Sequence, residues 1–432
     1  MIDAMEQNAL ARRRPAPATR GAVARLLFPP IHARFRVAIL LTFFPYGILY
    51  PLDYPAGELL TLCCWIWVFP SRIGWASLVL APFIPDQTYG YYAFNLFCLI
   101  ANPAIALSAI RSRELVPRDF ESLHRFVRNC MSAALAIGGL QAITDPFRWM
   151  AVFTNMRLES GRGAGLRLEP SQFSCLLVLY LAVLAGRMEF LRSIEGTMRR
   201  QRALLREGVL VILLTVALTR SFSVLIVVLC FVPALFVRRK HLLRLAATLM
   251  AGAAVGMFAL GDRLSDAVAT SGGSMTDLIT AGVDSWRNVP DILIVSNYRD
   301  FLLPGNPAEV RLKIHAFAAL MSPLTAWIQN TFSEFSAGGV TAGLAGTIAI
   351  MFAVLARGLR STPSARMRCT WLLVYLTAWF FMAKWDSSAW VALGLLSLTH
   401  KLTEKQAKRS VDRLREKSAQ EQRHRPPAKA EA

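Results

Sequence analysis

This sequence lacks the short motifs by which nucleotide-driven proteins hold phosphate. It contains no Gly-Lys dipeptide, so it has no phosphate-binding loop of the kind that ATP-driven transporters use. It contains no Asp-x-Asp pair, which removes the commonest metal-bound nucleotide-sugar chemistry. Acidic residues are also few, 28 against 48 Lys and Arg, which gives a formal net charge of +20. ATP-driven transport by this chain alone is therefore not expected.

Cysteine is also sparse, and its placement excludes two further classes. All seven cysteines lie in or beside apolar runs, and none lies in a long polar segment. Neither a disulfide framework nor a metal-ligand spacing can be read from them, so we expect small buried hydrophobic side chains and no metal or other cofactor.

What the sequence does contain is apolar length. Hydrophobic residues make up 54% of the chain, and the mean hydropathy is +0.41. This composition is typical of an all-α polytopic membrane protein, here with about twelve transmembrane helices. The basic charge clusters beside apolar runs, which favours orientation signals over nucleic-acid binding. The candidate spans are 36–52, 55–70, 73–85, 90–110, 126–144, 171–186, 208–220, 222–237, 242–260, 338–356, 369–383 and 387–400.

The distribution of Lys and Arg predicts the topology of these spans. If the N-terminus is inside and the spans alternate, 37 of the 48 basic residues fall on the inner side. This bias predicts a multi-pass membrane protein with both termini cytoplasmic. The domains expected are a flexible basic arm over 1–35, a transmembrane domain over 36–400 and a charged tail over 401–432.

Two segments on the predicted outer side are long, 145–170 and 261–337. The second is too long for a simple connector. Helical spacing of apolar residues over 277–303 and 311–327 predicts short amphipathic helices that cap the bundle. The density of Trp, Ile, Leu and Phe argues against disorder there.

The first outer segment carries arginines close to a predicted helix start. Arg162 and Arg167 precede Glu169-Pro-Ser171, a sequence suited to the first turn of a helix. Guanidinium groups at a helix N-terminus can hold an anion such as pyrophosphate. The alternative is a surface loop with ordinary charges.

Three further residues on the outer side are candidates. Arg220 lies between two apolar runs with almost no loop, where it either binds a ligand or extends to the membrane surface. Arg287 lies beside aromatic residues in the long segment and could instead form a structural ion pair with a nearby Asp. His315 stands on an amphipathic helix, where packing is the alternative to chemistry.

The segment Arg162-Gly-Ala-Gly-Leu-Arg-Leu-Glu-Pro-Ser171 resembles a motif of the Wzy-type polysaccharide polymerases, which belong with the O-antigen ligases. The resemblance extends to Thr219-Arg-Ser221, to Arg287 and to the segment from Asn330 to Gly346. Gln329 stands where the ligases usually carry a His, which favours a polymerase. The resemblance implies a GT-C-like fold with a large periplasmic loop.

The resemblance also implies an activity: transfer of a glycan from an undecaprenyl-pyrophosphate carrier onto another lipid-linked repeat unit at the periplasmic face, without a metal, to make exopolysaccharide. Glu169, or else His315, would act as the general base. Asn330 and Glu334 would orient the acceptor or brace the loop. The pyrophosphate contacts would come from Arg162, Arg167, Arg220 and Arg287.

Other functions remain open. The alternatives are an O-antigen-type ligase, a flippase for lipid-linked sugars, and a scaffold for a synthesis complex. A flippase should carry charged residues within its spans, whereas here the charges gather at the outer mouth. Expected partners are the lipid-linked glycan, membrane lipids, a flippase and chain-length or export proteins.

Overall fold

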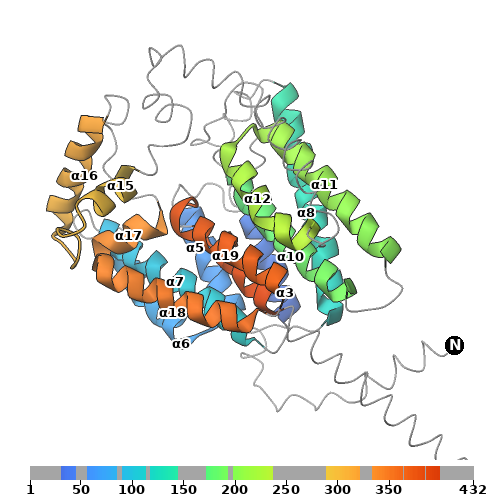
Figure 1. Cartoon of the computed structure of the whole chain (residues 1–432), viewed down its shortest axis with the longest axis horizontal. Helices are drawn as coiled ribbons and strands as arrows, with labels where there is room; N and C mark the ends of the chain where they lie inside the picture. Colours follow the sequence, from blue (N-terminus) through green and yellow to red (C-terminus); the bar gives the residue numbers. More distant parts are fainter. Residues whose placement is uncertain are drawn as a thin grey trace, which may run out of the picture.

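Apolar runs of the sequence form helices that lie side by side in one bundle (Figure 1). Among the described residues there is no strand, only an isolated antiparallel bridge between Ser333 and Ala383. This confirms the predicted all-α fold. The computed structural model describes residues 31–44, 56–84, 90–112, 117–144, 172–192, 198–236, 289–321, 333–362, 364–384 and 386–398.

The helices of the first half follow the predicted apolar runs closely. The short α6 continues directly into a 3-10 turn, η1, where Pro82 lies inside the turn. The elements are α3 (Ile31–Phe43), α5 (Ala56–Val68), α6 (Arg72–Ser77), η1 (Leu78–Phe83), α7 (Gly90–Arg111), α8 (Pro117–Ile143), α10 (Phe173–Arg192), α11 (Met198–Thr219) and α12 (Phe222–Phe236).

The second half contains shorter helices and sharper turns. Its elements are α15 (Val289–Ser296), α16 (Pro307–Met321), α17 (Glu334–Thr341), α18 (Gly343–Ser361), α19 (Ala365–Phe380) and a last helix, Ser388–Leu398. Four helices of the described residues are long and apolar enough to cross a membrane: Gly90–Arg111, Glu121–Ile143, Phe173–Arg192 and Gly343–Ser361. The protein is therefore a membrane-associated, helical protein; the count of twelve spans stays a prediction, and the predicted span 242–260 lies outside the described residues.

One predicted span is wrong. The run 338–356 was expected to form a single helix, but the chain reverses at Ala342 between α17 and α18. Gly343 has a φ of 73°, a conformation that side chains with a Cβ rarely adopt. A Cβ there would also lie 2.6 Å from the carbonyl oxygen of Leu302. Glycine thus permits both the turn and the close approach of a neighbouring loop.

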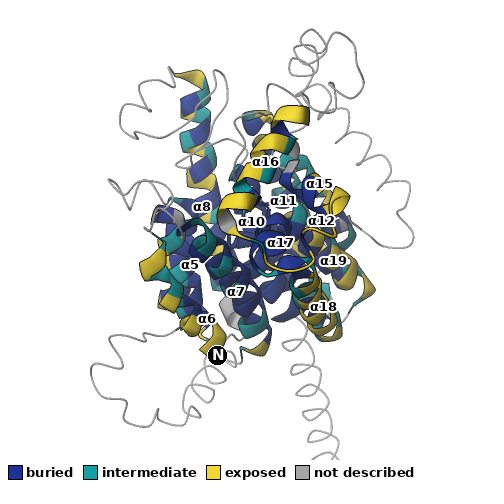
Figure 2. Ribbon diagram, turned by 90° about the vertical axis from the view of Figure 1, so that its left-hand side faces the viewer, coloured by how far each residue is buried: buried dark blue, intermediate teal, exposed yellow. Residues whose placement is uncertain are grey.

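The predicted helix over 277–303 is also too long. The described part of it is α15, which ends at Ser296 and passes into a turn at 297–300. The turn frees the carbonyl oxygens of Phe301 and Leu302, which accept hydrogen bonds from the first backbone amides of α18. α16 confirms the amphipathic helix predicted from Arg311 onward, and its exposed and buried faces are distinct in Figure 2.

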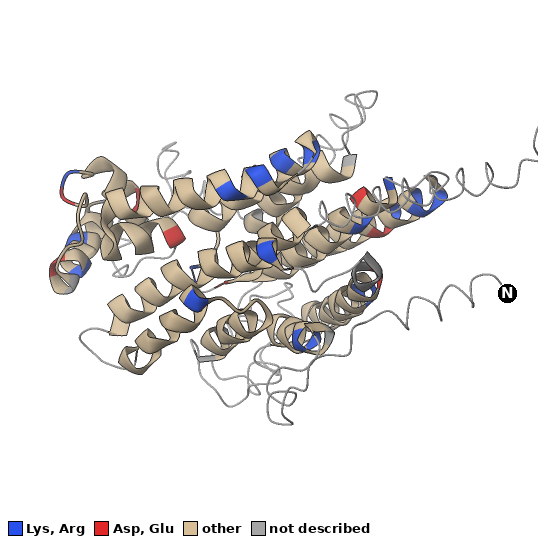
Figure 3. Cartoon of the chain, turned by 90° about the horizontal axis from the view of Figure 1, so that it is seen from below, with Lys and Arg blue, Asp and Glu red and all other residues tan. Residues whose placement is uncertain are grey.

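The basic ends of several helices meet at one end of the bundle. His124 of α8 contacts Arg187 of α10 and Glu207 of α11, so these helices bring the same end together. Arg366 at the start of α19 lies 3.7 Å from Glu189 of α10. Figure 3 shows Lys and Arg gathered toward this end, which we call the basic end. These Lys and Arg residues belong to segments predicted to lie on the inner side of the membrane. The compartment that the basic end faces stays a prediction.

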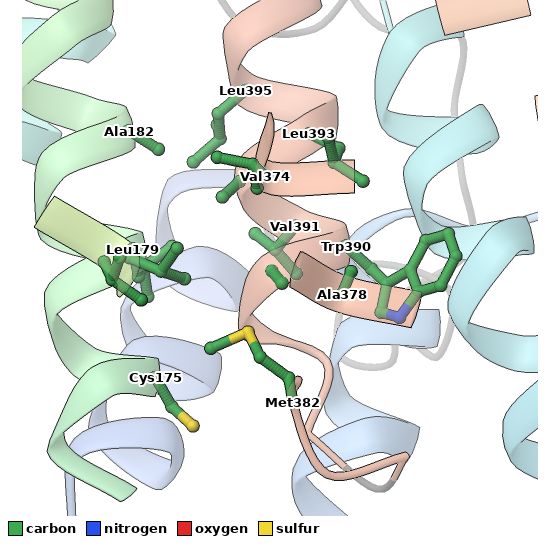
Figure 4. Packing of buried hydrophobic residues seen from close by; sticks show 14 of the residues in the cluster. Cys175, Leu179, Ala182, Val374, Ala378, Met382, Trp390, Val391, Leu393 and Leu395 are labelled. Atoms are coloured by element: carbon green, nitrogen blue, oxygen red, sulfur yellow. The ribbon is translucent and has the colours of Figure 1, made fainter. Parts of the chain in front are cut away.

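The apolar core lies between α10, α19 and the last helix (Figure 4). α10 is buried on all sides, from Phe173 to Ala185. Because its residues are buried on every face, α10 packs inside the bundle rather than against lipid. Tyr375 and Trp390 pack their rings edge to face, and Trp371 donates a hydrogen bond to the Leu393 carbonyl oxygen. These contacts hold α19 and the last helix together and so fix the turn between them.

Candidate functional site

The turn between α19 and the last helix carries a lysine that is buried in the bundle. Lys384 is only 3% exposed, and Glu334, at the start of α17, is fully buried. A buried charge is costly in a bundle of apolar helices unless other groups compensate it, and such residues commonly mark functional sites. These two residues are therefore the starting point for the site.

Lys384 extends along the polar side of α7. Its carbonyl oxygen accepts a hydrogen bond from Asn102 Nδ2 at 2.7 Å, and its Nζ donates to Asn95 Oδ1. The two asparagines are two helical turns apart and thus on one face of α7. The ammonium lies 4.9 Å from the Tyr91 ring centroid and 5.8 Å from that of Phe94, within the range of cation–π attraction.

Glu334 meets the same face of α7 from the other side. Its Oε2 accepts a hydrogen bond from Asn102 Nδ2 at 3.3 Å. Ser333 caps α17 by accepting from the Ser336 amide, and a carboxylate in the first turn of a helix is stabilised by the helix dipole. Asn95, Asn102, Glu334 and Lys384 together form what we call the Lys384 cluster.

The cluster lies well below the end of α7. Tyr92, near the start of α7, donates to the Val340 carbonyl oxygen, whereas Asn102 meets Glu334 at the other end of α17. α17 therefore runs antiparallel to α7 and enters the bundle. Asn102 lies about 18 Å along α7 from Gly90 at 1.5 Å per residue. Non-helical backbone at such a depth occurs in membrane proteins where it is enclosed by protein and often where a ligand binds.

Four buried polar atoms in and beside this cluster have no hydrogen-bond partner within the described ranges. They are Asn95 Nδ2, Asn102 Oδ1, Glu334 Oε1 and Ser388 Oγ. Buried polar atoms are nearly always paired in native proteins, so each unpaired one needs an explanation. Their concentration around one lysine shows that the groups of the described residues do not complete this cluster.

A second carboxylate joins the cluster through serine. Asp291 of α15 accepts a hydrogen bond from Ser333 Oγ, which also lies 2.9 Å from Ser336 Oγ. Burial raises the pKa of Asp291 to about 7, although the serine hydrogen bonds act in the opposite direction. This carboxyl group links α15 to the start of α17, and its charge changes near neutral pH.

A second buried polar group occupies the basic end. His124 is fully buried, and its Nδ1 lies 2.8 Å from Arg187 NH1. Its Nε2 lies 3.2 Å from Glu207 Oε1. Tyr180 donates to the same carboxylate oxygen at 3.0 Å. We call His124, Tyr180, Arg187 and Glu207 the His124 cluster; it joins α8, α10 and α11.

The structure describes three of the eight residues predicted for the site. Glu334 lies in the Lys384 cluster. Arg220 is exposed between α11 and α12, with a φ of 45°, and His315 is exposed on α16. Neither residue belongs to the Lys384 cluster, in which Glu334 bonds to Asn102. Arg162, Arg167, Glu169, Arg287 and Asn330 lie outside the described residues.

Three residues of the Lys384 cluster were not singled out from the sequence. Asn95 and Asn102 were two amides seven residues apart inside an apolar run, a pattern that marks one polar helix face. Lys384 and Asp386 are two charges in the short break between two apolar runs. These signals were present in the sequence. They did not show that the residues meet, because Asn102 and Lys384 lie 282 residues apart.

The Lys384 cluster offers amide, ammonium and carboxylate groups but no metal-binding set. No group of three or more His, Cys, Asp or Glu that could hold a metal ion occurs in the part of the chain that the structure describes. The cluster can therefore donate and accept hydrogen bonds and hold a proton. Comparison of the chain with protein-family models, curated proteins and solved structures finds no match.

Proposed function

We propose that this protein transfers a glycan from a polyprenyl-pyrophosphate carrier onto another lipid-linked repeat unit, and so polymerises a polysaccharide. The observation that carries the proposal is the placement of Glu334. The resemblance implies that this residue orients the acceptor or braces the loop, and its carboxylate lies in a buried polar cluster of a helical bundle. The resemblance of Arg162–Ser171 to the Wzy-type polymerases supplies the substrate class.

The chemistry needs a base and a set of cations. The acceptor hydroxyl oxygen forms a bond to the anomeric carbon while the bond from that carbon to the carrier pyrophosphate breaks. The hydroxyl proton passes to a carboxylate or imidazole, for which Glu169 and then His315 are the proposed groups. The pyrophosphate leaves with its own charge, so arginines can stabilise it without a proton or a metal. Arg162, Arg167, Arg220 and Arg287 are the proposed arginines.

The experiment is a cell-free assay of the purified full chain with lipid-linked repeat units. Elongated glycan supports a polymerase, transfer to a different lipid supports a ligase, and the absence of both removes the proposal. Arg162→Ala and Arg287→Ala should each abolish polymer while the protein level stays normal. Arg299→Ala is the matched control because Arg299 is exposed in the same long segment and contacts its sequence neighbour, Tyr298. Normal polymer length in both arginine variants would contradict the proposal.

A lipid-linked sugar flippase is the second candidate, and one observation favours it. The sequence indicated spans almost free of charge, yet Glu334 and Lys384 are buried between helices. Broken helices with buried charged residues are typical of substrate sites in transporters. A flippase would move labelled lipid-linked sugars across vesicles that contain the purified protein without lengthening the glycan. The same preparation therefore separates the two functions.

A further inference from the structure

The unpaired atoms of the Lys384 cluster include both donors and acceptors. Asn95 Nδ2 can only donate, whereas Asn102 Oδ1 can only accept. Glu334 Oε1 accepts when the group is ionised. All three residues are completely buried. Leaving a buried polar atom unsatisfied is costly, so three in one cluster indicate that a partner outside the described residues pairs with them.

One small molecule cannot pair with all of these atoms. Asn95 and Asn102 are seven residues apart, which places them about 10 Å from each other along α7. Asn102 and Glu334 share a hydrogen bond, so their free oxygens lie at the deeper end. The missing partner is either several separate waters or one extended molecule with hydrogen-bonding groups along its length.

The charges already present select the chemistry of that partner. The two free oxygens, one an amide and the other a carboxylate, disfavour a phosphate or another anion. A metal cation would be repelled by the Lys384 ammonium, which bonds to Asn95. A neutral molecule with hydroxyl groups satisfies both requirements, because each hydroxyl both donates and accepts a hydrogen bond.

One side of the cluster borders a residue that reaches the surface. Tyr91 borders the Lys384 ammonium and is itself only partly buried. Arg311 of α16 lies 5.4 Å from the Tyr91 ring centroid. Asn95 follows Tyr91 more closely along α7 than Asn102 does, so a ligand admitted beside Tyr91 would meet Asn95 before Asn102 and Glu334.

We propose that Asn95, Asn102, Glu334 and Lys384 form a subsite for the hydroxyl groups of a neutral saccharide, held along α7 by its unpaired amide and carboxylate atoms. The proposal rests on the proposed function for the source of the saccharide, the glycan end of a lipid-linked repeat unit. The carrier pyrophosphate would then bind elsewhere in the protein, at the proposed arginines. Asn95, Asn102 and Lys384 gain a role that the sequence motif does not give them.

The test measures saccharide binding without turnover. Saturation-transfer difference NMR on the purified full chain in detergent detects weak binding of a free hexose, an N-acetylhexosamine or a short oligosaccharide. We expect a signal from at least one of them and no competition from inorganic pyrophosphate. Asn102→Leu, which keeps the volume but removes the amide, should lower the signal at least fivefold. Thr215→Val is the control, because Thr215 is equally buried and bonds only to the Val211 carbonyl oxygen of its own helix.

Each outcome decides the proposal. No signal from any saccharide, or an unchanged signal in Asn102→Leu, would overturn it, as would displacement of the saccharide by pyrophosphate. Should Asn102→Leu not fold, Asn95→Leu replaces it with the same expectation. Should neither fold, a cryo-EM map of the unmodified chain with the strongest saccharide decides: saccharide density at Asn102 and Glu334 supports the subsite, and waters alone contradict it. Binding that survives without glycan transfer would contradict only the proposed function.

Discussion

The Lys384 and His124 clusters are both buried and both charged, yet they differ in how many of their polar atoms are paired. In the His124 cluster, the imidazole lies 2.8 Å from Arg187 NH1 and 3.2 Å from Glu207 Oε1, and one buried atom, His124 Nε2, lacks an aligned hydrogen bond among the described residues. In the Lys384 cluster, single atoms of Asn95, Asn102 and Glu334 have no partner among the described residues. A network whose charged groups face one another holds helices in place, whereas one with several free atoms is suited to bind something else.

The backbone around the two clusters differs in the same way. The His124 cluster joins three long continuous helices, α8, α10 and α11. The Lys384 cluster combines one face of the long helix α7 with a short helix, α17, and with the turn that follows α19. Regular helices satisfy their own backbone groups, while broken ones present free ends to a ligand. The comparison assigns a structural role to the basic end and a binding role to the other cluster.

The largest effect is expected from Lys384→Met. This change removes the ammonium that donates to Asn95 and that attracts the buried Glu334 carboxylate, and leaving a buried charge uncompensated typically costs about 3–5 kcal/mol. The thermal unfolding midpoint in detergent should fall by several degrees. The double variant Lys384→Met with Glu334→Gln should recover much of the loss. Equal stabilities of the single and double variants would show that the two groups are not coupled.

A slightly smaller and pH-dependent effect is expected at Asp291. Its pKa in the folded protein is about 7, against an ordinary value of 3.8, so the folded state holds the proton more tightly. The contribution of Asp291 to the free energy of unfolding is therefore fully present below about pH 4. It decreases as the pH rises toward 7, by up to about 4 kcal/mol in all. Asp291→Asn stays neutral while its side-chain oxygen still accepts from Ser333.

The measurement is the unfolding midpoint of both proteins from pH 5 to pH 8.5. The advantage of Asp291→Asn over the unmodified chain should grow across this range and level off above pH 7. A constant difference would mean that Asp291 is already ionised at pH 5. Because the group ties α15 to α17 through Ser333, the same series reports how firmly the Lys384 cluster is enclosed.

How far the sequence could predict this arrangement depends on the range of the interactions. The predicted run 90–110 matches α7 and 222–237 matches α12, because apolar length alone determines such helices. The reversal at Ala342 was missed, since the glycines around it also suit an ordinary packed helix. Its cause is tertiary: the backbone of Leu302 and Leu303 approaches Gly343.

The candidate site shows the same limit. Glu334 was identified from a local motif, and the structure places it in a polar cluster. Its partners could not be read from local sequence, because Asn102 precedes it by 232 residues. The His124 cluster was missed for a different reason: its charges fall beside apolar runs, where basic residues were already explained as orientation signals.

A moderate effect, on stability alone, is expected from Glu207→Gln. The change removes the charge that faces His124 and weakens the bond that Tyr180 donates. A loss of about 1–3 kcal/mol is expected for a partly buried, hydrogen-bonded carboxylate. Saccharide binding at the Lys384 cluster should stay unchanged. If Glu207→Gln abolished saccharide binding in a folded protein, the assignment of separate structural and binding roles would be wrong.

The smallest effect is expected from Arg125→Ala, at the surface of the same basic end. Arg125 and Glu121 form an ion pair across one turn of α8, at 3.7 Å, with side chains 63% and 57% exposed. Such pairs contribute about 0.3–0.5 kcal/mol and are screened by salt. The unfolding midpoint should therefore barely change, and the change should vanish in high salt.

Arg187→Ala, one helix away and bonded to buried His124, should cost several times more because it leaves a buried imidazole unpaired. Equal decreases of the unfolding midpoint in the two variants would mean that burial does not distinguish these arginines. The contrast between buried and exposed charged groups at the basic end would then be wrong.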